Sequence, residues 1–90
     1  MARILVGPRV EKALRGRDEA YVQAVAQALE RFVENERHPS LHFEKLSGSR
    51  DVFTIRINRG DRIFLRRRAD PAGAIYDVMD IGSHDLYRRR

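Results

Sequence analysis

The feature that most constrains this chain is a pair of alternating segments that predicts a β-hairpin. Apolar and polar side chains alternate with period two through residues 52–57 and again through 61–66, as they do in strands that bury one face. Residues 58–60 then form a three-residue loop, in which Gly60 is expected to take the left-handed conformation that such loops need. The loop length fixes how the two arms pair.

This pairing places two arginines side by side. Arg56 falls opposite Arg62, and like charges directly opposite each other destabilise a sheet. A protein keeps such a pair most readily where an anion lies between the two guanidinium groups. Taken alone, the pair is explained equally well by two solvated arginines that splay apart. The other predicted pairs are Phe53 with Leu65, Ile55 with Ile63 and Ile57 with Asp61 on one face, and Thr54 with Phe64 on the other.

The charge of the chain also favours an anionic partner. The net charge is +5, and of the 18 basic residues only Lys12 and Lys45 are lysines. Arginine binds phosphate through two parallel hydrogen bonds, which lysine cannot do. Residues 41–90 contain eleven basic and seven acidic side chains, against seven and six in residues 1–40. The basic half is therefore the half with the predicted hairpin, a distribution typical of nucleic-acid binders.

Ninety residues suffice for a single domain, 1–90, with one core. Residues 3–6 form a short apolar run that predicts a first strand, and Pro8 opens a short helix that buries Val10, Ala13 and Leu14. Asp18 is a candidate N-cap for a longer helix that ends by His38, before Pro39. The apolar stripe expected along this helix consists of Val22, Val25, Ala26, Leu29, Phe32 and Val33.

The remaining segments predict more strands. Residues 41–46 form a strand or an extended lead-in, and residues 74–81 are apolar on both faces, as a strand inside a sheet is. The predicted fold is α+β, a small antiparallel sheet with two N-terminal helices packed on one face. Its other face is expected to be open and to carry Thr54, Arg56, Arg62, Phe64 and Arg66.

The residues suited to chemistry are arginines, one histidine and one tyrosine. His84 directly follows the last predicted strand, with Tyr87 three residues later, and histidine moves protons near neutral pH. There is no cysteine, no histidine pair at metal-ligand spacing and no Gly-rich phosphate loop, so neither a metal nor a cofactor is expected. These groups suit metal-free cleavage of RNA, in which Phe64 or Tyr87 can stack on bases.

The whole chain resembles the RelE/ParE superfamily of bacterial toxins from toxin–antitoxin pairs. The resemblance depends on the order and spacing of five segments rather than on any one of them. These segments are 38–41 (His-Pro-Ser-Leu), 43–48 (Phe-Glu-Lys-Leu-Ser-Gly), 52–57 (Val-Phe-Thr-Ile-Arg-Ile), 60–63 (Gly-Asp-Arg-Ile) and 81–88 (Ile-Gly-Ser-His-Asp-Leu-Tyr-Arg).

The resemblance implies an mRNA interferase, an endoribonuclease that cleaves mRNA in the ribosomal A site and so inhibits translation. Arg56 and Arg62 match positions that grip the scissile phosphate, while His84 and Tyr87 share the acid and base roles, with His84 favoured as base. Family members often carry a basic residue where Thr54 stands. Lys45, Arg50 or Arg66 is expected to supply this missing charge. Together with Arg56, these three are the candidate RNA-binding residues.

The resemblance also implies partners and alternatives. An acidic antitoxin is expected to form a hetero-oligomer with the chain. Separately, the apolar run at the amino terminus is too short for a signal peptide or a membrane span, which predicts a cytoplasmic chain. The alternatives are a ParE-like inhibitor of DNA gyrase, or a catalytically inactive module that binds RNA or antitoxin.

Overall fold

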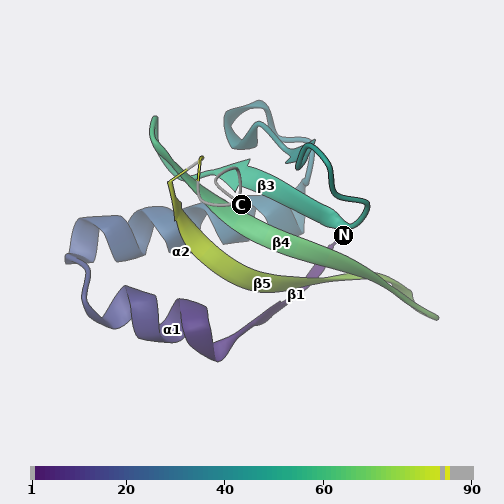
Figure 1. Cartoon of the computed structure of the whole chain (residues 1–90), viewed down its shortest axis with the longest axis horizontal. Helices are drawn as coiled ribbons and strands as arrows, with labels where there is room; N and C mark the ends of the chain where they lie inside the picture. The colour runs from purple at the N-terminus through teal and green to yellow at the C-terminus, as the bar shows by residue number, and fades with distance from the viewer. Residues whose placement is uncertain (1, 84, 86–90) are drawn as a thin grey trace.

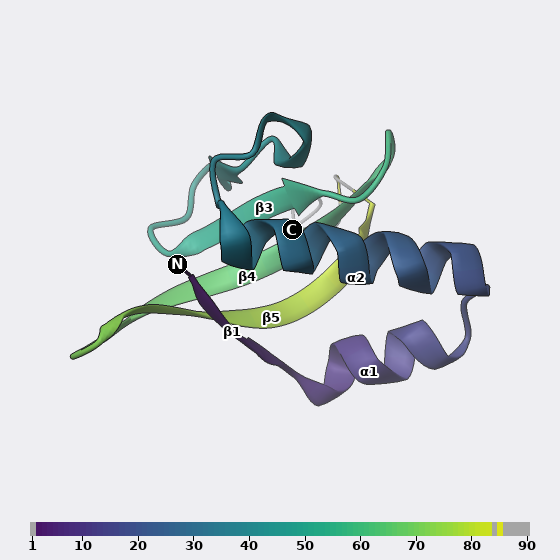
Figure 2. The same ribbon diagram turned by 180° about the vertical axis from the view of Figure 1, so that it is seen from behind.

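The computed structural model describes residues 2–83 and 85. The elements are β1 (Arg3–Val6), α1 (Pro8–Arg15), α2 (Glu19–Glu34), the 3₁₀ turn η1 (Pro39–Leu41), β2 (Glu44–Lys45), β3 (Val52–Arg56), β4 (Asp61–Asp70) and β5 (Gly73–Ser83). The two helices form one layer and the sheet forms the other (Figure 1; Figure 2). No helix of the described ranges is long and apolar enough to cross a bilayer.

The sheet has five strands in the order β1-β5-β4-β3-β2. Both helices cover the same face (Figure 2), so the predicted α+β architecture is confirmed. The sheet is mixed, because β1 pairs parallel with β5 while the other neighbours are antiparallel. A parallel pair cannot be joined by a tight turn, and here α1, α2 and the other strands separate β1 from β5 in the chain. At the junction of β1 and α1 the Gly7 N–H donates to the Val78 carbonyl oxygen at 3.2 Å.

The helices begin where the sequence predicts. Pro8 occupies the first turn of α1, and the Asp18 carboxylate caps α2 by accepting from the Tyr21 N–H at 2.9 Å. The predicted apolar stripe of α2 is confirmed at Val25 and Phe32, which are buried, but Ala28 is buried in place of Ala26, which is exposed. The core that α2 covers contains Val10, Val25, Ala28, Phe32, Ile55, Ile63, Leu65, Tyr76 and Val78.

The predicted register of the β3–β4 hairpin is confirmed, including the pair Arg56 and Arg62. The Ile57 N–H also donates to the Asp61 carbonyl oxygen at 3.1 Å. The expected left-handed Gly60 is wrong, since this glycine does not have a positive φ. Instead the Asn58 side chain shapes the turn, because its Oδ1 accepts from the N–H groups of Gly60 and Asp61 at 2.9 Å each.

The face opposite the helices is less open than predicted. Phe64 is fully buried and Thr54 nearly so, which means that Phe64 is not available to stack on a base. Phe64 lies in β4, the central strand of the sheet. Arg56 and Arg62 are half-buried at one end of this face, and Arg66 is exposed.

Candidate nucleic-acid interface

Arg56 and Arg62 meet at the end of the hairpin next to the turn. Arg56 ends β3 and Arg62 is the second residue of β4. Both guanidinium groups donate to the carbonyl oxygen of Asn58, from Arg56 Nε at 3.4 Å and from Arg62 Nη1 at 3.2 Å. Arg62 Nη1 also donates to the Asp61 carbonyl oxygen at 3.1 Å. The turn therefore supplies main-chain acceptors that hold two like charges together.

Neither arginine of this pair has a carboxylate partner within residues 2–83 and 85. The position across from Arg62 on β5 is Gly82, which has no side chain to crowd the guanidinium. Two unneutralised guanidinium groups on adjacent strands form a site for an anion that accepts several hydrogen bonds, such as a phosphate.

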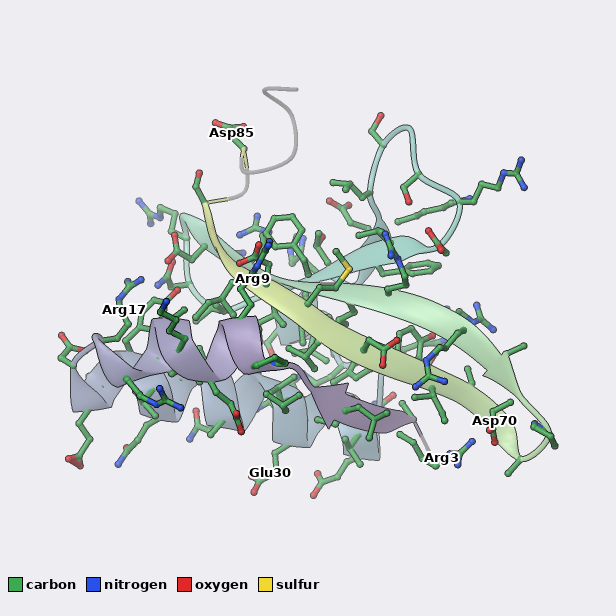
Figure 3. All side chains as sticks on the ribbon, turned by 60° about the horizontal axis from the view of Figure 1, so that its bottom comes forward. Arg3, Arg9, Arg17, Glu30, Asp70 and Asp85 are labelled. Carbon is green, nitrogen blue, oxygen red and sulfur yellow. The ribbon has the colours of Figure 1, made fainter. Side chains whose placement is uncertain are left out.

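Asp61 lies beside the pair, but its carboxylate faces the helices. Its Oδ2 accepts from the Tyr21 hydroxyl at 2.6 Å and lies 3.8 Å from Arg17 Nη2. Arg17, which lies between α1 and α2 (Figure 3), also places its guanidinium carbon 3.6 Å from the centroid of the Tyr21 ring. Burial, followed by the hydrogen bond to Asp61, raises the pKa of Tyr21 to about 12.

This cluster of Arg17, Tyr21 and Asp61 connects the start of α2 to the start of β4. Sequence reasoning missed it, because Tyr21 and Asp61 are distant in the chain and neither has a motif that signals the contact. Its consequence is that Asp61 supports Arg62 through its main-chain carbonyl and not through its carboxylate.

The other predicted RNA-binding residues lie apart from the pair. Arg66 shares the face of Arg62 but forms an ion pair with Asp51 at 3.6 Å. Lys45 is exposed and pairs with Phe53 in register, which places it on the helix side of the sheet. Arg50 is exposed on the loop before β3. The structure therefore brings Arg56 and Arg62 together and separates Lys45 and Arg50 from them.

The predicted proton-transfer residues, His84 and Tyr87, lie outside the described residues. The strand before them is described to its end, where Gly82 pairs with Arg62 and Ser83 with Asp61. The roles of these two residues stay predictions from the sequence.

A cavity of about 290 Å³ adjoins Arg56 on the helix side. It lies between α2, η1 and the end of β3, and its polar lining residues are Gln27, Arg31, Ser40 and Arg56. Arg56 therefore belongs to the guanidinium pair and also lines this cavity.

The protein is similar to known proteins in its structure and not in its sequence. No protein-family model and no curated protein matches the sequence. Among solved structures, the YoeB/ParE toxin from Agrobacterium tumefaciens superposes with a TM-score of 0.71 and 13% identity, over 91% of this chain and 98% of that one.

Two further solved structures are similar over most of both chains. The antitoxin–toxin complex RelB-RelE from Methanococcus jannaschii matches with a TM-score of 0.62 and 14% identity, over 94% of this chain and 95% of that one. The YoeB dimer from Staphylococcus aureus has a TM-score of 0.62 and 19% identity, over 88% and 94%. The chain thus has the fold of the RelE/ParE superfamily of toxins.

Proposed function

We propose that this chain is the toxin of a toxin–antitoxin pair and an endoribonuclease that cleaves mRNA on the ribosome. The observation that carries the proposal is the Arg56–Arg62 pair, which is aligned across β3 and β4 and has no carboxylate partner within the described ranges. The basic composition and the fold shared with YoeB and RelE toxins support the same proposal.

In the proposed reaction the RNA itself supplies the nucleophile. The 2′-oxygen attacks the adjacent phosphorus, its proton passes to a base, and the bond to the 5′-oxygen breaks as an acid protonates that oxygen. The products are a 2′,3′-cyclic phosphate and a 5′-hydroxyl. His84 and Tyr87 are the proposed base and acid, with His84 favoured as the base.

Arg56 and Arg62 have a separate role in this mechanism. The non-bridging oxygens of the phosphate gain negative charge as the 2′-oxygen attacks, and guanidinium groups already held in place stabilise that charge without reorganising. The hydrogen bonds from both arginines to the Asn58 carbonyl provide this preorganisation. The turn therefore acts as the support for the phosphate site.

An acidic antitoxin is the proposed partner. The structural neighbour from Methanococcus jannaschii is a complex of toxin and antitoxin, and the net charge of +5 favours association with an acidic chain. Co-expression with an acidic protein encoded beside this one should restore growth and yield a hetero-oligomer. A complex that forms equally well after both Arg56 and Arg62 are changed to Glu would count against a charge-driven grip at the site.

Pulse labelling after induced expression separates the proposed activity from its alternatives. Incorporation of labelled amino acids should stop while DNA synthesis continues. A ParE-like gyrase inhibitor should stop DNA synthesis while protein synthesis continues, and an inactive binding module should stop neither. A second test uses programmed ribosomes whose mRNA carries 2′-O-methyl groups, which removes the nucleophile: cleavage should stop on this substrate and persist on unmodified mRNA.

A further inference from the structure

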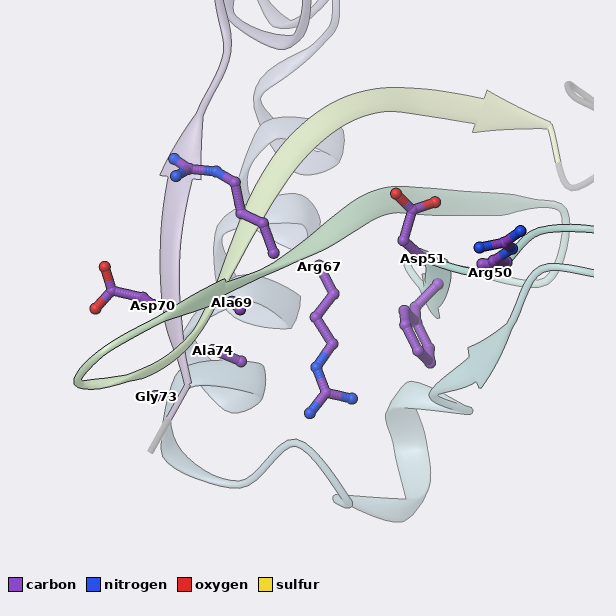
Figure 4. Close-up of a pocket in the computed structure, with 9 residues that line it drawn as sticks. Arg50, Asp51, Arg67, Ala69, Asp70, Gly73 and Ala74 are labelled. Atoms are coloured by element: carbon purple, nitrogen blue, oxygen red, sulfur yellow. The ribbon is translucent and has the colours of Figure 1, made fainter.

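A second basic hollow lies at the other end of β3 and β4 from the Arg56–Arg62 pair. It has a volume of about 500 Å³ and forms where the β4–β5 hairpin runs on beyond the start of β3. The Arg67 N–H donates to the Asp51 carbonyl oxygen at 2.8 Å, which holds the preceding loop against β4. Figure 4 shows Arg67 extending from β4 into the hollow and Arg50 on the loop at its far side. We call this hollow, lined by Arg50, Phe53 and Arg67, the hairpin cleft.

Most charges around the hairpin cleft are neutralised by one another. The ion pairs are Arg68 with Asp77, Arg66 with Asp51, and Arg3 with Asp70. Figure 3 shows the last pair at the tip of the β4–β5 hairpin. In contrast, Arg50 and Arg67 form no ion pair with any residue of 2–83 or 85. Two guanidinium groups of the cleft are therefore available to an anion.

An aromatic ring completes the cleft. Phe53 pairs with Leu65 across β3 and β4, and Arg67 is two residues further along β4, so Arg67 is the diagonal neighbour of Phe53 on the same face. The Phe53 ring stacks on Phe43 with centroids 5.1 Å apart and planes 19° apart. This stacking fixes its orientation, and the ring remains partly exposed to the cleft.

We propose that the hairpin cleft binds a nucleotide of single-stranded RNA, with its base on Phe53 and its phosphates on Arg50 and Arg67. An oriented aromatic ring beside unpaired cations is the combination by which proteins hold single-stranded nucleic acid. An acidic peptide needs the cations but not the ring. Because Arg67 lies five residues along β4 from Arg62, or roughly 17 Å, this contact is separate from the cleavage site. The inference rests on the RNA substrate of the proposed function and adds a second point of attachment.

The test measures binding of a short, fluorescein-labelled single-stranded RNA that carries 2′-O-methyl groups throughout and so cannot be cleaved. Fluorescence anisotropy gives the Kd at a series of salt concentrations from about 50 to 200 mM. Each phosphate contact to a single strand contributes a slope of about 0.7 to log Kd against log salt. The double variant Arg50→Gln/Arg67→Gln should therefore lose about 1.4 from that slope. Phe53→Leu, which retains apolar volume, should raise Kd about fivefold or more.

The matched control is Arg15→Gln on α1, because Arg15 is exposed and has no ion pair within the described ranges. It should leave the slope close to that of the parent. A loss of slope in the control that is half of the loss in the double variant, and so equal for each charge removed, overturns the inference, since RNA would then sense only overall charge. Binding of an oligoglutamate peptide that depends on Arg50 and Arg67 but not on Phe53, with RNA binding unchanged in Phe53→Leu, also overturns it in favour of a protein ligand.

Failure of this inference is distinguishable from failure of the proposed function. A parent chain that binds RNA through the hairpin cleft and cleaves none contradicts the ribonuclease and leaves the cleft in place. A parent chain that cleaves RNA, while the double variant binds with the parental slope, contradicts the cleft alone.

Discussion

Tyr21→Phe should destabilise the protein through the loss of a single hydroxyl group. That hydroxyl donates to the Asp61 carboxylate at 2.6 Å, and a hydrogen bond to a charged group contributes about 1.5–3 kcal/mol. The site is only partly buried, so we expect the lower end, about 1.5 kcal/mol. For a domain of this size each kcal/mol lowers Tm by roughly 4–8 °C, which gives a fall of roughly 6–12 °C.

The same hydroxyl should produce a step in stability at alkaline pH. Tyrosine in the unfolded chain loses its proton near pH 10, whereas Tyr21 in the folded protein keeps its proton up to about pH 12. Between these values the unfolded state binds fewer protons, so the free energy of unfolding falls as pH rises. Solvent screening at this partly exposed site reduces the loss to about 1 kcal/mol. The parent should therefore lose most of its advantage over Tyr21→Phe between pH 10 and 12.

Urea unfolding of the parent, Tyr21→Phe, Asp61→Ala and the double variant measures this interaction directly. The two single changes should be non-additive by about 1 kcal/mol or more, because each removes the same hydrogen bond. Additivity within about 0.3 kcal/mol, or an unchanged difference between parent and Tyr21→Phe up to pH 12, would refute the reasoning.

Three further changes have defined outcomes. Asn58→Ala removes the acceptor for the N–H groups of Gly60 and Asp61; urea unfolding should show a loss of about 1–2 kcal/mol, and RNA cleavage should fall as well. Phe64→Ala should cost about 3–5 kcal/mol in the same assay, because the ring is fully buried. Gly73→Ala should lower Tm, since Gly73 has a φ of +124° that side-chain-bearing residues rarely adopt; an unchanged Tm would contradict this.

The sequence predicts the β3–β4 hairpin well because its determinants are local. A short turn and period-two alternation set the register, which places Arg56 opposite Arg62. The parallel pairing of β1 with β5 could not be predicted, since β1 is short and its partner comes from the far end of the chain. The buried face of α2 was only partly predicted, because apolar residues such as Ala26 and Ala28 both fit a helical stripe and only the packing decides between them.

In the candidate site, too, the features set by local sequence could be predicted and those set by tertiary packing could not. The guanidinium pair follows from the hairpin, whereas the link from Tyr21 to Asp61 depends on how α2 lies against the sheet. Alternation correctly placed Phe64 opposite Thr54 but not its burial, because alternation assigns a side chain to a face of the sheet and does not show what covers that face. His84 and Tyr87 lie outside the described residues, and their roles remain predictions.

The most direct measurement is a melting curve for Arg62→Ala beside an RNA-cleavage assay on programmed ribosomes. Removing Arg62 relieves repulsion with Arg56 in the free protein and loses two hydrogen bonds to the turn, so the two effects oppose each other and Tm should change little. Cleavage should fall by about 10²–10³, the typical cost of losing one donor to a transition-state charge, while the control Arg15→Ala cleaves like the parent. An unfolded Arg62→Ala would make Arg62 structural and the site misplaced, and cleavage at the parental rate would contradict its role at the phosphate.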